Sequence, residues 1–148
     1  MTTLTNQKSD AETVLDALID GLRVTDIQLN ERCELALQAI GQRALPSLTA
    51  ATNTATRPAH RRRLLAAIEL IEDSDAQPSD ATQCIWRALL DALRVSDDQL
   101  NAKAVAAIGR CHPSAVFELI SLATYHRRNK GYSQRLQVAA MRVGRQER

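Results

Sequence analysis

The sequence has few of the residues on which nucleotide-binding loops, disulfide frameworks and metal sites depend. It contains five glycines in 148 residues, and no GxGxxG or GxxxxGK[ST] loop that would cradle a phosphate occurs. The three cysteines, Cys33, Cys84 and Cys111, are an odd number at unrelated spacings, which predicts reduced thiols rather than disulfides. The histidines show no spacing typical of a zinc site. We therefore expect no metal, no cofactor and no enzymatic activity.

Long apolar runs are also missing. No run approaches the roughly 18 apolar residues of a membrane-spanning helix, and residues 1–9 are polar, without the apolar centre of a signal peptide. These features predict a cytoplasmic protein with no membrane association and a disordered segment at 1–9. Aromatic residues make up only 3% of the chain, which suits helices packed closely through small side chains.

What the chain does contain is an internal duplication. Residues 23–30 return in similar form at 94–101, 71 positions later. A unit of roughly seventy residues is repeated, which predicts two halves at about 10–73 and 80–145. The polar segment 74–79 separates them. Upstream of each copy, apolar residues recur at the spacing of one helical face, at Val14, Leu15, Leu18, Ile19 and Leu22 in the first half and Ile85, Trp86, Leu89, Leu90 and Leu93 in the second.

Each copy of the repeated segment is predicted to join two helices. Thr25 and Ser96 have the chemistry of N-cap residues, and Gln28 and Gln99 stand three positions later, as in a capping box. Just upstream of the first joint, Asp20 lies beside the apolar stripe, one helical turn after another aspartate. This spacing is typical of a solvated helix face.

Helix signals without strand-like alternation predict an all-α fold. The segment Ala36–Gly41, followed by Ala44–Leu48, resembles the first helix and the start of the second helix of a HEAT repeat. Ala104–Gly109, followed by Pro113–Val116, is similar. The resemblance implies a right-handed α-α solenoid of about eight helices, in four HEAT-like pairs. It covers 10–148 as a single repeat domain.

Positive charge gathers in two clusters, one before the last helix of each half. Residues 110–148 alone carry eight basic and two acidic side chains, which favours an acidic partner. The alternative is that these are solubilising turn residues whose stems cover apolar surface. The candidate binding residues are Arg61, Arg62, Arg63, Tyr125, Arg127, Arg128, Lys130, Tyr132 and Arg135.

The sequence indicates a non-catalytic scaffold or adaptor that binds another macromolecule, with a protein as the first candidate partner. The alternative function is binding to the backbone of a nucleic acid, because arginines grip phosphates and tyrosines stack on bases. A second copy of the chain, docking through the terminal repeats, is a further candidate partner. A third interpretation, an enzyme-associated or lyase-like repeat protein, has no residues that point to it.

Overall fold

The computed structural model describes residues 10–73, 81–111 and 116–146, and these residues form helices and connecting turns without strands. The linker predicted at 74–79 and the segment 1–9 lie outside the described residues. The elements are α2 (Asp10–Arg23), α3 (Ile27–Ile40), the 3₁₀ helix η1 (Gly41–Ala44), α4 (Leu45–Thr54), α5 (Pro58–Glu72), α6 (Ala81–Arg94), α7 (Asp98–Cys111), α8 (Val116–Tyr125) and α9 (Lys130–Gln146).

The predicted apolar faces are the faces that become buried. All five apolar residues of the α2 stripe are buried. In α6, Leu89 and Leu93 have almost no exposed surface, whereas Ile85, Trp86 and Leu90 are partly buried against the core. Gly41 ends α3 with a φ of 79°, a backbone conformation that glycine adopts without steric cost. Gly109, by contrast, does not end α7, which continues to Cys111. The last helix begins at Lys130 and continues to Gln146.

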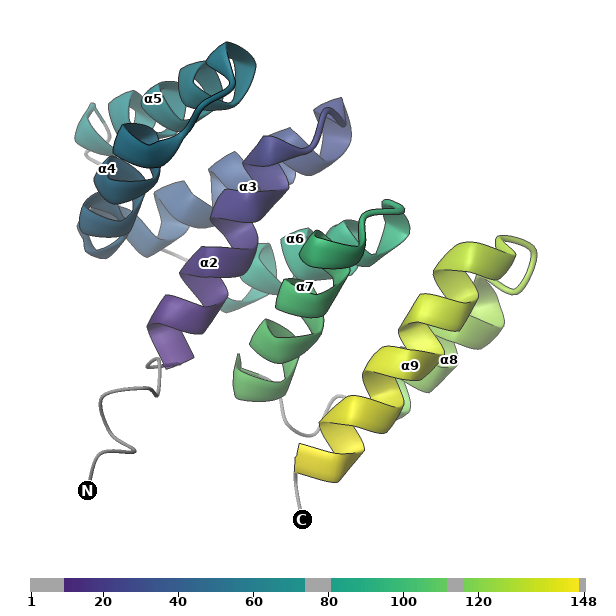
Figure 1. Cartoon of the computed structure of the whole chain (residues 1–148). Coiled ribbons are helices and arrows are strands. Elements are labelled where there is room, and N and C mark those ends of the chain that lie inside the picture. The colour runs from purple at the N-terminus through teal and green to yellow at the C-terminus, as the bar shows by residue number, and fades with distance from the viewer. Residues whose placement is uncertain (1–9, 74–80, 112–115, 147–148) are drawn as a thin grey trace, which may run out of the picture.

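The helices form antiparallel hairpins, in which α2 packs on α3, α4 on α5, α6 on α7 and α8 on α9. In Figure 1 the four hairpin turns lie along one edge of the molecule, which runs from the top of the picture to its right side, and both chain ends lie at the opposite edge. We call the side that carries the four turns the turn edge. The α2–α3 and α6–α7 turns are its inner turns, and the α4–α5 and α8–α9 turns are its outer turns.

The two halves pack against each other as a pseudo-two-fold pair. Helix α2 contacts α7, and α3 contacts α6, so the first helix of each half meets the second helix of the other half. This exchange is the signature of an isologous interface. The α4–α5 and α8–α9 hairpins cover the two outer sides, with α5 against α2 and α3, and α9 against α6 and α7. The order across the molecule therefore departs from a solenoid, in which each hairpin stacks on the one before it in the chain.

Reciprocal polar contacts join the halves at the inner turns. The Arg23 guanidinium lies 2.8 Å from a carboxylate oxygen of Asp97, and the Arg94 guanidinium lies 2.8 Å from Asp26. Every residue of this four-membered network belongs to the duplicated segment. The repetition therefore reflects a shared interface as well as a shared helix joint.

The same contacts correct the predicted caps. The Asp26 carboxylate accepts the Leu29 backbone N–H at 2.9 Å, so Asp26 is the N-cap of α3 and Thr25 lies exposed outside the helix. Asp97 accepts the Leu100 N–H in the same way in the second half. Asp26 and Asp97 cap the helices in place of Thr25 and Ser96, because a carboxylate can bind both the helix N-terminus and an arginine of the other half.

The predicted capping-box glutamines have a different role. Gln28 donates from Nε2 to Asp91 at 2.9 Å, and Gln99 donates to Asp20 at 2.9 Å. Both bonds cross between the halves. Asp20 and Asp91 are only 5% and 6% exposed, so the prediction that Asp20 belongs to a solvated helix face is wrong.

We expect Asp26→Ala to lower the free energy of unfolding by about 1–2 kcal/mol, because it removes an N-cap and one ion pair between the halves. Thr25→Ala should change it by less than about 0.5 kcal/mol, as surface substitutions usually do. Urea denaturation of both variants would measure the difference. Equal losses in the two variants would contradict the assignment of the cap to Asp26.

Inside the hairpins, the two halves use different residues to fill one equivalent position. In the first hairpin, a Cβ added at Gly21 would overlap the sulfur of buried Cys33. The equivalent positions in the second hairpin, 71 residues later, are Ala92 and Ala104, both buried. The glycine–cysteine pair and the alanine–alanine pair have a similar total volume and therefore fill equivalent spaces between the two helices of each hairpin.

This exchange predicts strong coupling between the two positions. Gly21→Ala alone should destabilise the protein by about 1–3 kcal/mol through overpacking, whereas Gly21→Ala with Cys33→Ala should restore most of that loss. A double-mutant cycle from denaturation curves would measure the coupling free energy. Additive effects of the two substitutions would show that the positions are not in contact as described.

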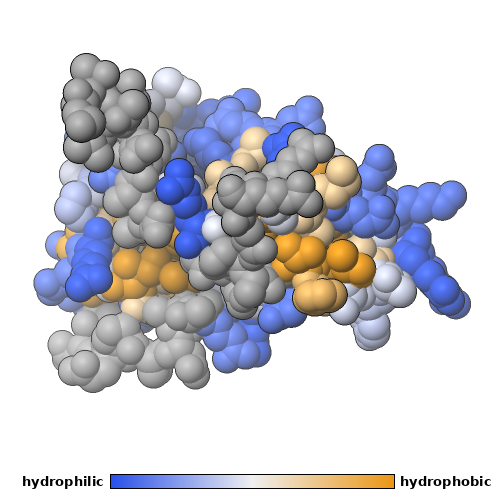
Figure 2. Space-filling model, turned by 90° about the horizontal axis from the view of Figure 1, so that it is seen from below, coloured by the Kyte–Doolittle hydropathy of each residue, from blue (hydrophilic) through white to orange (hydrophobic). Residues whose placement is uncertain are grey.

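The edge opposite the turns differs in character. Figure 2 views this edge and shows apolar side chains gathered in two areas. Phe117, at the start of α8, is 82% exposed. The turn edge carries exposed arginines and a lysine in its outer turns, together with the exposed side chains of Ile27 and Tyr125.

Candidate functional site

The inner turns carry charges that are already neutralised. Arg23 bonds the carboxylates of Asp20 and Asp97, and Arg94 bonds those of Asp91 and Asp26. The hydrogen bond that Arg23 donates to Asp20 raises the pKa of Arg23, and the one that Arg94 donates to Asp91 raises the pKa of Arg94. With their guanidinium groups held between two carboxylates, these arginines have little capacity left for an external anion.

The cap carboxylates titrate below their ordinary range. The Leu29 backbone N–H, followed by the Arg94 guanidinium, lowers the pKa of Asp26. The Leu100 N–H and then Arg23 do the same for Asp97. Both effects stabilise the charged form in the folded protein only.

These shifts predict a loss of stability in acid. Because the folded-state pKa values are lowered, the stabilisation is fully present above the unfolded aspartate pKa, near 3.9, and disappears as the pH falls through the folded-state values. We expect the urea concentration at the midpoint of unfolding to decrease once the pH is lowered below about 4. The decrease should be smaller in the double variant Asp26→Asn, Asp97→Asn. Denaturation between about pH 3 and pH 7 would show this. An equal decrease of the urea midpoint with pH in the variant and the unmodified protein would contradict this prediction.

The outer turns carry charges with no such neutralisation. In the α4–α5 turn and the first turn of α5, Arg57, Arg61 and Arg62 are exposed. In the α8–α9 turn, Arg127, Arg128 and Lys130 are exposed. None of the six has an ion-pair partner among residues 10–73, 81–111 and 116–146. We call these two groups the outer basic turns, and both lie on the turn edge (Figure 1).

An exposed aromatic residue accompanies the second outer basic turn. Tyr125 is 82% exposed, and its ring meets His126 edge-on with centroids 5.0 Å apart. On the other side of His126 lies Tyr132, at 4.8 Å, but Tyr132 is only 8% exposed. Of the two candidate tyrosines, Tyr125 is thus the one whose surface faces solvent.

Two of the candidate arginines have structural partners. Arg63 donates to the backbone carbonyls of Leu22 and Arg23 at the end of α2. Arg135 donates to Leu93 and to Arg94, at 2.9 Å from the latter. Helix ends leave carbonyls without intrahelical donors, and each arginine supplies them from a neighbouring hairpin. Arg63 and Arg135 therefore fasten α5 to α2 and α9 to α6.

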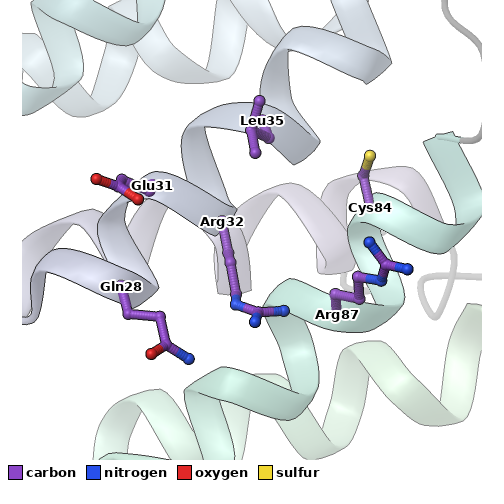
Figure 3. Close-up of a pocket in the computed structure, with 6 residues that line it drawn as sticks. All are labelled: Gln28, Glu31, Arg32, Leu35, Cys84 and Arg87. Atoms are coloured by element: carbon purple, nitrogen blue, oxygen red, sulfur yellow. The ribbon is translucent and has the colours of Figure 1, made fainter.

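A groove between α3 and α6 contains a second group of cations, which the sequence interpretation missed. It encloses about 420 Å³ and is lined by Gln28, Glu31, Arg32, Leu35, Cys84 and Arg87. Figure 3 shows the Arg32 and Arg87 side chains extending into the space between the two helices, whereas Glu31 points away from both. Arg32 and Arg87 lie 55 positions apart in the sequence, so no local motif joins them.

The remaining features argue for no further site. Among the described residues, no group of three or more histidine, cysteine, aspartate or glutamate side chains is arranged to hold a metal ion. Within the same ranges, no helix has both the length and the apolar character needed to cross a membrane. Cys33 is buried inside the first hairpin, and burial raises the pKa of its thiol, so it has the character of a packing residue.

No protein family, curated protein or solved structure matches this chain. The candidate sites therefore rest on the geometry of the chain itself. That geometry includes one internal comparison, because each half of the duplication serves as a reference for the other.

Proposed function

We propose that this protein is a non-catalytic binding module, a scaffold or adaptor that docks an acidic partner protein along its turn edge. One observation supports this function above the others. Six exposed cations occupy the two outer turns without partners in the described residues, while the arginines of the inner turns are fully paired.

The paired arginines of the inner turns and the unpaired cations of the outer turns lie on the same edge of the molecule (Figure 1), so one partner could contact all four turns. Exposed cations on a helical protein usually serve solubility alone, and they are then mixed with carboxylates. Here Asp26 and Asp97 of the inner turns are used between the halves, Asp98 is exposed at the start of α7, and positive charge gathers at both ends. A partner spanning both outer basic turns would cross the α2–α3 and α6–α7 turns between them. An extended acidic segment has the required length and charge, whereas a small ligand would reach only one end.

Binding to a nucleic-acid backbone is the second candidate function, and Tyr125 favours it. The Tyr125 ring is exposed beside Arg127 and Arg128, and an aromatic ring next to arginines is a platform on which bases stack. Only one of the outer basic turns has such a ring. The acidic protein therefore remains the first candidate.

The test is a fluorescence-anisotropy titration with two labelled probes, a polyglutamate peptide and a single-stranded oligonucleotide, at low and high salt. We expect the peptide to bind at low salt, and binding to weaken as salt screens the charges. Arg127→Glu with Arg128→Glu should abolish it. If the oligonucleotide alone binds, with an affinity that falls steeply with salt concentration, the second function replaces the first.

The matched control reverses the same number of charges away from the turn edge. Arg43, in η1 between α3 and α4, and Arg142, in the last part of α9, are exposed, and the start of α4 and the end of α9 lie away from the turn edge (Figure 1). The double variant Arg43→Glu, Arg142→Glu changes the net charge by the same amount. This variant should retain binding. Arg23 and Arg94 are unsuitable as controls, because reversal there would break the interface between the halves. Absence of binding by either probe at low salt, or equal loss in the control variant, would contradict the proposed function.

A further inference from the structure

The groove between α3 and α6 brings two like charges together across an interface. Arg32 comes from α3 in the first half, and Arg87 comes from α6 in the second. Both side chains extend into the space between the helices (Figure 3). Two guanidinium groups that share one groove repel each other unless an anion lies between them, and no described residue forms an ion pair with either.

The nearby carboxylates do not supply that anion. Asp91 is buried beside the groove, but its oxygens already accept bonds from Arg94 and Gln28. Glu31 lines the groove, yet its carboxylate points away from both arginines (Figure 3). The groove therefore has an excess of positive charge where the two arginines extend into it.

The pseudo-two-fold relation supplies an internal comparison. The equivalent positions lie where α2 meets α7, in a pocket that residues of α4 and α5 also line, and there Lys103 occupies the place of Arg32 and Asp16 the place of Arg87, each displaced by 71 positions. In that pocket a cation faces carboxylates, and the Lys103 ammonium lies 3.8 Å from Asp20. The shared scaffold therefore does not require two arginines. Their presence in one groove distinguishes it from the other.

We propose that the groove between α3 and α6 is a binding site for a small phosphate monoester, held by Arg32 and Arg87. A phosphate monoester carries close to two negative charges at neutral pH, and planar guanidinium groups bind its oxygens in pairs. The Leu35 and Cys84 side chains form an apolar wall against which the organic part of the ester rests. The volume of about 420 Å³ lies within the roughly 300–1,000 Å³ of small-molecule sites.

This site is separate from the outer basic turns. Arg32 and Arg87 line the groove between the halves, whereas the cations of the outer basic turns lie on the hairpins that flank it. The two proposals can therefore fail independently. The double reversal Arg127→Glu, Arg128→Glu, which should abolish binding at the turn edge, should leave the groove intact.

The direct test is a nuclear magnetic resonance titration that follows the arginine Nε–Hε signals of the full chain. The probes are glycerol 3-phosphate and inorganic phosphate, with sodium acetate and sodium chloride as controls at constant ionic strength. We expect the Arg32 and Arg87 signals to shift and saturate with either phosphate, and to shift little with acetate or chloride. Saturation by inorganic phosphate with an affinity equal to that of the ester would assign the site to free phosphate and overturn the choice of ester.

The matched variant converts this groove into its counterpart, with Arg32→Lys and Arg87→Asp. It should weaken phosphate binding by at least roughly tenfold, because it replaces one bidentate group and reverses the other charge. Arg87→Ala alone should also weaken binding, and circular dichroism of both variants would verify that they are folded. Unchanged binding in folded variants would overturn the proposal, as would shifts of the same size with chloride.

Discussion

Two buried carboxylates determine how this chain is assembled. Asp20 and Asp91 each lie in the first helix of a half, almost without exposed surface. Burying an ionised carboxylate is costly unless several donors surround it. Each is satisfied partly from its own helix, by Arg23 or Arg94, and partly from the other half, by Gln99 or Gln28. Neither half alone supplies the complete set of donors, so the two helix pairs must meet in one arrangement to avoid an unsatisfied buried charge.

That requirement explains why the repeated segment is so similar in the two halves. In an isologous interface, a residue and its counterpart perform the same task on opposite sides, so one sequence must serve both. The arginine, aspartate and glutamine of the segment all make contacts between the halves, and the asparagine holds its own turn. Asn30 donates to the carbonyls of Gly21 and Val24, and Asn101 donates to those of Ala92 and Val95. Away from this interface the halves differ, as the Gly21–Cys33 pair and the two grooves show.

The helices themselves could be predicted from the sequence, because their apolar spacing and turn residues act locally. The α2 stripe and the turn at Gly41 depend on neighbours within a few positions. The role of Asp20 could not be predicted in this way, since an aspartate one turn from another aspartate has the same local pattern whether it faces water or a second half. The predicted N-caps lie one residue before the observed N-caps for a similar reason. Thr25 and Asp26 are both suitable caps, and the arginine that favours Asp26 comes from 68 positions away.

The candidate site was predictable to the extent that it is local. The outer basic turns stand out as runs of arginine and lysine, although Arg63 and Arg135 within those runs bind helix ends instead of solvent. The groove arginines could not be found by sequence reasoning, because a chain-order solenoid does not bring α3 and α6 together. Once the two-fold relation is known, the comparison of positions 16 and 87, and of 32 and 103, identifies the groove from the sequence alone. A duplication of this kind is therefore informative in two ways, since equal residues locate the shared interface and unequal residues locate the surfaces on which the two halves have diverged.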